Sequence, residues 1–260
     1  EKFIERPRHI EIQVLADEYG HILAFPERDC SLQRRHQKLI EETPSPAVDA
    51  CVRRKLQKIA RKICRIINYK NAGTIEFLMG GRHVYFMEMN TRIQVEHPIT
   101  EMITGFDLVK NQIEIASGEK MRYHHRFVPF TGHSIECRIN AENPARDFLP
   151  SPGKITKLVL PGGPGIRVDT HIYEGYVVPP FYDSLLAKLI SYGRTRQEAI
   201  TRMQRALNEM KIEGISTTID FYKVVLDHPV FQSGRYYVGW LEKLLNDMKN
   251  KQAVGSAAGG

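Results

Sequence analysis

The sequence predicts an α+β fold, with an antiparallel sheet and flanking helices over about residues 1–128 and a smaller mixed α+β unit over about residues 133–245. Three patterns support this prediction. Residues 8–16 alternate apolar and polar side chains, as a half-buried strand does. Residues 48–67 repeat apolar side chains every three or four positions, which is typical of an amphipathic helix. Gly80-Gly81 separates two short apolar runs and indicates a hairpin.

The first unit contains strands and helices in a regular order. Glycine suits the position after a helix because it readily adopts positive φ, so Gly105 and Gly118 mark an interruption and a stop. The basic, irregular stretch at 119–132 is the predicted boundary with the second unit. In chain order we expect strands at 8–16 and 21–25, a helix at 48–67, a hairpin of strands at 74–78 and 83–89, and a helical region at 98–117.

The second unit is richer in strands, which Gly and Pro separate. Thr195 followed by Glu198 forms a capping box that begins a helix. A last helical region covers roughly residues 217–247, and residues 246–260, which end in small side chains, are predicted to form a disordered tail. The expected strands are 134–140, 154–160, 166–170 and 185–191.

Composition excludes several classes of protein. No apolar run approaches the ~18 residues of a membrane span, and the first residues lack the apolar core of a signal peptide and read like the middle of a longer protein. The net charge is +7, but no nucleic-acid-binding signature accompanies it, so we interpret it as a solvated basic surface or a phosphate-binding cleft. The four cysteines lack metal-like spacing, which favours a reduced, cytoplasmic protein.

The predicted hairpin carries a candidate metal site. Glu88 and Asn90 are two residues apart on one strand, so their side chains share a face, and pairing with the neighbouring strand would place Glu76 beside them. Two carboxylates and an amide oxygen on one face repel each other unless a cation lies between them, and such oxygen ligands select Mg²⁺ or Mn²⁺. A solvated polar strand face would give the same alternation and is the competing interpretation.

The segment after the hairpin keeps the period of two. Arg92 offers a planar fork to a small oxyanion, Gln94 adds a second donor, and Glu96 could take a proton. Such a cluster suits bicarbonate or carboxylate chemistry better than a purely structural strand does.

Around these residues the chain resembles biotin carboxylases, a branch of the ATP-grasp superfamily. The resemblance extends over residues 1–245 and rests on long, ordered motifs. The matching segments are Pro7–Gln13, Glu27–Lys38, Glu41-Glu42, Glu76, Glu88–Glu101, Glu136–Glu142, Phe148–Ile155, Tyr182–Ser184 and Lys188.

The resemblance implies the C-terminal half of an ATP-grasp fold followed by the smaller C-terminal domain of the family. It implies an enzyme that uses ATP and bicarbonate to carboxylate biotin on a carrier protein, the first half-reaction of acetyl-CoA carboxylase in fatty-acid synthesis. The implied partners are a biotin carboxyl carrier protein, carboxyltransferase subunits and a second copy in a homodimer, with no nucleic acid and no membrane. The implied compartment is the cytoplasm, or the plastid or mitochondrial matrix in a eukaryote.

The resemblance also implies residue roles. Glu96 would be the general base that deprotonates bicarbonate, and Arg138 would bind biotin and stabilise charge on its ureido oxygen. Arg92, Gln94 and the Val95 backbone would clamp bicarbonate, with Arg92 counted as catalytic. Glu76, Glu88 and Asn90 would hold Mg²⁺ or Mn²⁺. The implied ATP-binding residues are Glu1, Lys2 and Ile4 in a hinge strand against the adenine, together with His9, Gln33, His36, Lys38, Glu76 and Glu88.

Several alternatives stay open at this point. The same segment could come from a pyruvate, propionyl-CoA or methylcrotonyl-CoA carboxylase, or it could be a non-catalytic assembly module. Arg138 could instead form a structural ion pair with Glu136 or Glu142. In the family, the lobe that precedes Glu1 supplies a glycine-rich lid and two lysines to the phosphates. We therefore expect these 260 residues alone to fold but not to turn over.

Overall fold

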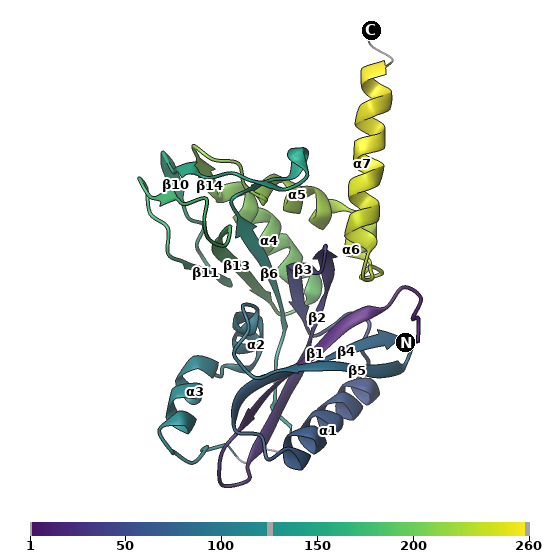
Figure 1. The fold of residues 1–260 in the computed structure, drawn as a ribbon, viewed down its shortest axis with the longest axis vertical. Coiled ribbons are helices and arrows are strands. Elements are labelled where there is room, and N and C mark those ends of the chain that lie inside the picture. Colours follow the sequence, from purple (N-terminus) through teal and green to yellow (C-terminus); the bar gives the residue numbers. More distant parts are fainter. Residues whose placement is uncertain (1, 124–126, 258–260) are drawn as a thin grey trace.

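The computed structural model describes residues 2–123 and 127–257. Within these residues one eight-stranded sheet, antiparallel throughout, runs through the molecule in the order β11-β13-β6-β3-β2-β1-β4-β5 (Figure 1). The α+β prediction is therefore confirmed. The strands of this sheet are β1 (Arg8–Ala16), β2 (Ile22–Arg34), β3 (Gln37–Thr43), β4 (Asn71–Gly80), β5 (His83–Asn90), β6 (His133–Asn140), β11 (Ile166–Thr170) and β13 (Leu185–Gly193).

Helices and short strands surround this sheet. Among the described residues, no helix is long and apolar enough to cross a membrane. The helices are α1 (Ala50–Ile66), α2 (His97–Thr104), α3 (Leu108–Ala116), α4 (Arg196–Glu209), α5 (Ile219–Asp227), α6 (Pro229–Gln232) and α7 (Trp240–Ala257), with a 3₁₀ turn at Pro144–Arg146. The short strands are β7 (Glu142–Asn143), β8 (Leu149–Pro150), β9 (Gly153–Lys154), β10 (Lys157–Val159), β12 (Val177–Val178) and β14 (Lys211–Glu213).

Helix α1 confirms the amphipathic pattern of residues 48–67. Asp49 caps it by accepting hydrogen bonds from the backbone N–H groups of Cys51 and Val52, both at 2.8 Å. Such a cap stabilises a helix by about 1 kcal/mol. The helix buries one apolar face, which includes Leu56 and Ala60, against β1, β2 and β4.

Helix α4 confirms the predicted start at Thr195, whose hydroxyl accepts a bond from the Glu198 backbone N–H at 3.2 Å. The carboxylate of Glu198 returns to the backbone N–H of Arg194 at 2.8 Å, one residue before the position that a capping box uses. The buried face of α4, with Ala199 and Met203, covers β13 and β6.

The sheet is continuous across the predicted boundary. Strand β3 of the first unit pairs with β6 of the second, with Ile40 opposite Cys137. Behind this junction the buried Glu42 carboxylate lies 2.6 Å from His133 Nε2 and 2.7 Å from Arg196 Nε. The hydroxyl of Tyr236 donates to the same carboxylate. The two predicted units therefore share one sheet and a buried polar junction.

The structure differs from the prediction in four places. Strands β2 and β3 extend over residues that showed no apolar alternation, because charged side chains such as Arg28 and Glu41 are buried there. The expected strand at 154–160 is divided between β9 and β10. Residues 2–7 form no strand, since Arg6 has φ 44° and Pro7 has no N–H to donate to a ladder.

The fourth difference concerns the expected disordered tail at 246–260. Helix α7 continues through this segment to Ala257 and projects away from the rest of the molecule (Figure 1). Leu, Glu, Lys, Gln and Ala make up much of the helix and favour helical backbone, whereas Val254, Gly255 and Ser256 near its end do not. Residues 258–260 lie outside the described residues.

Candidate active site

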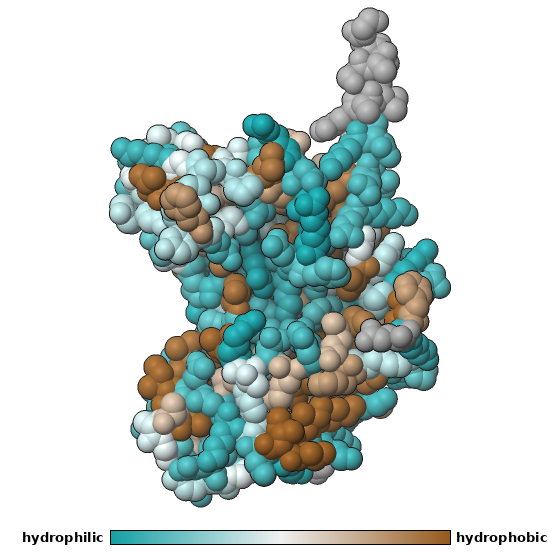
Figure 2. All heavy atoms as spheres, viewed as in Figure 1, coloured by the Kyte–Doolittle hydropathy of each residue, from teal (hydrophilic) through white to brown (hydrophobic). Residues whose placement is uncertain are grey.

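Most of the predicted site residues line one cleft of about 590 Å³, formed by β1–β6, the 91–96 segment and the start of β13. Figure 2 shows hydrophilic side chains gathered across the middle of the molecule, between its upper and lower parts. The predicted residues in the cleft lining are His9, Gln33, His36, Lys38, Glu76, Glu88, Asn90, Arg92, Gln94, Val95, Glu96 and Arg138.

The predicted adenine-binding segment does not line this cleft. Glu1 lies outside the described residues. The ammonium of Lys2 lies 5.2 Å from the centre of the Tyr85 ring. The side chain of Ile4 packs so closely on Gly80 that a Cβ there would meet Ile4 Cγ2 at 2.7 Å. Both residues thus contact the β4–β5 hairpin rather than the cleft.

Strands β4 and β5 bring the candidate metal ligands together. Glu76 is directly opposite Glu88 in the register, and Thr74 is opposite Asn90. The Asn90 amide nitrogen lies 3.1 Å from one oxygen of Glu76 and 3.4 Å from one oxygen of Glu88. The two facing carboxylates supply oxygen donors that fit Mg²⁺ or Mn²⁺. The Asn90 amide directs its nitrogen at them and its oxygen at Arg92, so it would have to turn to offer its oxygen to a metal ion.

Lys38 is at the centre of the charged groups in the cleft. Its ammonium donates to Glu11 at 2.6 Å, Glu96 at 2.7 Å and Glu76 at 3.1 Å. Burial opposes the charge on both Glu11 and Lys38, but each stabilises the other's charge. The pKa of Glu11 therefore lies well below its ordinary value, and the pKa of Lys38 lies well above it.

His9 connects the metal ligands to the predicted nucleotide side of the cleft. Gln33 Nε2 lies 2.8 Å from His9 Nδ1, and His9 Nε2 lies 2.9 Å from Glu76 Oε2. Burial would raise the pKa of Glu76, but the bond from His9 and the charge of Lys38 outweigh it and lower this pKa to about 2. Glu76 is therefore ionised over the whole neutral range, as a metal ligand requires.

Glu96 is buried and connects Lys38 to Arg138. One of its oxygens accepts from Lys38 at 2.7 Å and the other from Arg138 at 2.9 Å. Arg138 also donates through Nε to Glu41 at 2.7 Å. The expected alternative, an ion pair of Arg138 with Glu136 or Glu142, is not the pairing that the structure contains. Arg138 instead faces the proposed base directly.

The residues predicted to clamp bicarbonate flank Glu96. Arg92 is exposed to the cleft, where its guanidinium bonds to the Ile93 carbonyl at 3.2 Å and contacts Asn90 Oδ1 at 3.5 Å. Gln94 is buried and donates from Nε2 to Glu76 at 2.8 Å. The Val95 carbonyl accepts from Lys188 at 3.3 Å. These contacts place an exposed guanidinium and a fixed amide beside the proposed base.

Sequence reasoning missed several polar residues of the site. Glu11 was part of a polar face in the 8–16 alternation, so that pattern could have identified it. Arg28 and Glu41 lay in segments that match the family, but their roles gave no local signal, because each acts through partners that are distant in the sequence. On the far side of the cleft, Ser184 donates to Glu142 at 2.5 Å and accepts from Asn140 at 2.9 Å.

Two buried carboxyl groups lie behind Arg138. Glu41 and Glu136 face each other across the β3–β6 pairing, and both are fully buried. Within the described residues, neither oxygen of Glu136 has a hydrogen-bond partner. Burial raises the pKa of Glu41 to about 7 in spite of Arg138. Burial and the neighbouring Glu41 raise the pKa of Glu136 well above its ordinary value.

We expect the protein to become less stable relative to a Glu136→Gln variant as the pH rises. Folded Glu136 binds its proton more tightly than the unfolded chain does. The stability linked to that proton is complete below the ordinary pKa of 4.5 and is lost as the pH rises through the raised value. Calorimetric unfolding of both proteins between about pH 5 and about pH 9 measures this difference. Parallel curves for the two proteins would contradict it.

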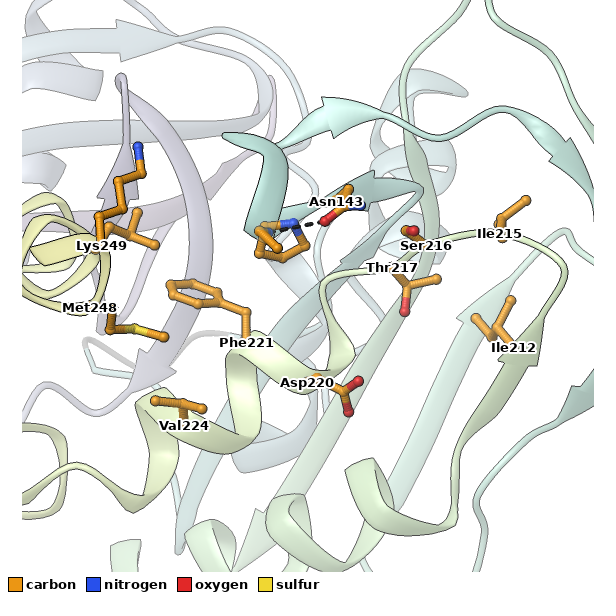
Figure 3. Close-up of a pocket in the computed structure, with 13 residues that line it drawn as sticks. Asn143, Ile212, Ile215, Ser216, Thr217, Asp220, Phe221, Val224, Met248 and Lys249 are labelled. Carbon is orange, nitrogen blue, oxygen red and sulfur yellow. Dashed lines mark hydrogen bonds between the residues drawn. The ribbon is translucent and has the colours of Figure 1, made fainter. Parts of the chain in front are cut away.

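A second cavity of about 440 Å³ lies apart from these residues, between α5, α7 and the segment after β14 (Figure 3). Phe221, Val224 and Met248 contribute apolar side chains to it, and Asp220 and Lys249 are the charged groups among the described residues that line it. None of the predicted site residues belongs to this lining, so the polar cleft is the candidate active site.

Comparison with known proteins shows the family of this chain. Residues 1–124 match the family described as carbamoyl-phosphate synthase L chain, ATP binding domain. Residues 136–243 match the biotin carboxylase C-terminal domain. The chain is 54% identical over 245 residues to a biotin carboxylase of Nostoc sp., and the match covers 94% of this chain and 55% of that protein. It is also 54% identical over 243 residues to a pyruvate carboxylase subunit of Methanothermobacter thermautotrophicus, covering 94% and 50% of the two chains.

A solved structure shares the fold as well as the sequence. The biotin carboxylase domain dimer of Hydrogenobacter thermophilus 2-oxoglutarate carboxylase, in complex with MgADP, ADP and bicarbonate, superimposes with a TM-score of 0.91. The identity is 48%, and the match covers 94% of this chain and 54% of that one. The chain thus spans about half the length of the relatives that it matches. From two successive domain matches, the fold and the sequence identity, we conclude that this chain belongs to the biotin carboxylase family.

Proposed function

We propose that these residues supply the metal-, bicarbonate- and biotin-facing side of an enzyme that carboxylates biotin on a carrier protein with ATP and bicarbonate. One observation carries the proposal. Glu96, held between Lys38 and Arg138, lies in the same cleft as the facing carboxylates Glu76 and Glu88. A base beside an oxyanion clamp and a metal-ligand set is what activation of bicarbonate by a nucleotide requires, and it supports catalysis over a pure assembly role.

Each group in the cleft has a role in the proposed first step. Arg92, Gln94 and the Val95 backbone hold bicarbonate, and Glu96 takes its proton so that a bicarbonate oxygen can attack the γ-phosphate of ATP. A Mg²⁺ or Mn²⁺ ion held by Glu76, Glu88 and Asn90 would neutralise charge on the phosphates.

We assign the remaining ATP contacts to His9, Gln33 and His36, which line the same cleft. All three donors of the Lys38 ammonium are taken by carboxylates, so contact with a phosphate requires it to release one of them.

Biotin is the second substrate in this proposal. As its ureido nitrogen loses a proton, negative charge grows on the ureido oxygen, and a guanidinium beside that oxygen stabilises the transition state. Arg138 suits this role because it lines the cleft and contacts the base Glu96. Its strand, β6, is separated from β5, which carries Glu88, by four strands of the sheet.

Replacing Arg138 by Ala tests the assignment. In an active enzyme that carries these residues, Arg138→Ala should impair carboxylation of free biotin more than bicarbonate-dependent ATP hydrolysis. The first activity needs the ureido oxyanion to be stabilised, and the second does not. Parallel assays of both activities with Arg138→Ala and Arg138→Lys measure the difference. An equal loss of both would assign Arg138 to the phosphates or the fold.

We further propose that carboxylated biotin serves acetyl-CoA carboxylase in fatty-acid synthesis, with a biotin carboxyl carrier protein and carboxyltransferase subunits as partners and a homodimer as the assembly. The match to a pyruvate carboxylase makes pyruvate the second candidate for the acceptor. The cysteines are all free, which supports a reducing compartment, the cytoplasm or a eukaryotic organelle. Assays of the purified holoenzyme with acetyl-CoA and with pyruvate distinguish the two acceptors.

A further inference from the structure

Arg28 is a buried cation that the mechanism above does not use. It lies on β2, and its side chain has 0% of its surface exposed. A guanidinium has five N–H donors, and the structure gives this one five hydrogen bonds. Its acceptors are Glu11, Gln13 at 3.0 Å, Thr100 at 3.0 Å, Thr74 at 3.3 Å and Gln94 at 3.3 Å.

Two of these acceptors, Gln94 and Glu11, also bond to residues of the cleft lining. Gln94 accepts from Arg28 on Oε1 and donates from Nε2 to Glu76 at 2.8 Å. Glu11 accepts from Arg28 on one oxygen and from the ammonium of Lys38 on the other, at 2.6 Å. Arg28 therefore fixes both from behind, on the side away from the cleft.

The bond to Gln94 contributes to the choice of which end of the amide points into the cleft. An amide has an acceptor end and a donor end that are nearly equal in shape. Because Arg28 is a donor only, it holds Oε1, and Nε2 is left to face the cleft. Glu76 holds the other end of the amide, since it accepts from Nε2 at 2.8 Å. Without Arg28 only that bond remains, so the amide turns more easily and presents its oxygen to an anion, which repels an anionic ligand.

We propose that Arg28 is a positioning residue for the bicarbonate end of the site, acting through Gln94 and, by way of Glu11, through Lys38. The inference rests on the proposed function, since bicarbonate is the ligand in question. Its contacts with Gln13, Thr74 and Thr100 tie together β1, β4 and α2. If these structural contacts were the whole role of Arg28, its replacement would lower the stability of the protein. It would not raise the KM for bicarbonate more than the KM for ATP.

The experiment replaces Arg28 by Lys in an active enzyme that carries these residues. A lysine keeps the charge but has no planar fork, so it cannot hold Glu11 and Gln94 together. We expect the KM for bicarbonate to rise about 10–100-fold, the range that loss of an outer partner of a ligand produces. The KM for ATP should change much less.

Arg53→Lys is the matched control. Arg53 also pairs with a buried glutamate, Glu27, through two bonds of 2.6 and 2.8 Å, away from the cleft lining. It should lose stability without any selective change in the KM for bicarbonate. If Arg28→Lys behaves like Arg53→Lys, Arg28 is only structural and the inference is wrong.

Two further measurements keep the outcome decisive. In a Gln94→Ala background, Arg28→Lys should have little additional effect on the KM for bicarbonate, because its main route of action is already removed. If Arg28→Lys does not fold, Thr100→Val leaves one N–H of Arg28 without its acceptor and loosens the guanidinium that holds Gln94. This variant should raise the same KM selectively, and an unchanged KM would refute the proposal. Wild-type enzyme without bicarbonate-dependent ATP cleavage would refute the proposed function itself, a separate result.

Discussion

Replacement of Glu96 by Gln is expected to reduce bicarbonate-dependent ATP cleavage by about 10²–10⁴-fold, the usual contribution of a positioned general base. Glutamine keeps the size of the side chain but cannot take a proton from bicarbonate. It also offers an N–H group to Lys38 or Arg138, which are donors themselves, so one of those bonds is lost. The loss should therefore appear in kcat.

Nucleotide affinity separates this role from a metal-binding one. If Glu96 is a base, the affinity for ATP, measured by calorimetric titration, should stay close to that of the wild type. A comparable loss of ATP binding would contradict the assignment. Glu101→Gln provides the control, because Glu101 pairs with Arg167 at 2.7 Å outside the cleft lining, and the same isosteric change there should leave bicarbonate chemistry intact.

Replacement of Glu88 by Gln should weaken Mg²⁺-dependent turnover more than any other single change among the candidate ligands. Glu88 is exposed to solvent in the cleft, where Asn90 approaches its carboxylate at 3.4 Å. Its charge therefore contributes little to the fold, whereas Glu76 also bonds to Lys38 and Gln94. We expect the Mg²⁺ concentration for half-maximal activity to rise beyond the ~10–100-fold that an outer partner causes.

The stability of the Glu88→Gln variant serves as its control. A surface substitution of this kind usually changes the free energy of unfolding by less than about 0.5 kcal/mol, so calorimetric unfolding should be close to that of the wild type. A Mg²⁺ titration that superimposes on the wild-type curve would show that Glu88 is not a ligand.

Local patterns predicted the parts of the site that one hairpin builds. Alternation in the hairpin placed Glu88 and Asn90 on one face, and the register confirms that Glu76 lies opposite Glu88. The helices were predictable for the same reason, since their apolar periodicity and caps are local. Residues such as Val95 and Arg138 entered the prediction through resemblance to the family alone.

Long-range partners were beyond the reach of those patterns. The alternative considered for Arg138 was an ion pair with Glu136 or Glu142 on its own face, but its partners are Glu41 from a neighbouring strand and Glu96 from the segment before α2. The continuation of strand β2 beyond residue 25 was hard to recognise because buried polar and charged residues such as Arg28 break the apolar alternation that identifies strands. Which charged residues are buried depends on partners 17 to 97 positions away, such as Glu11 for Arg28 and Arg138 for Glu41.

The continuous sheet has a consequence for any attempt to divide this protein. If the chain were cleaved between α3 and β6 and the two pieces separated, β3 and β6 would lose their pairing partners. Each piece would then expose an unpaired edge strand. Unpaired backbone donors and acceptors on such edges capture strands from other molecules. The separated halves would tend to aggregate, or to recombine with each other, and the split chain would behave as a pair of complementing fragments.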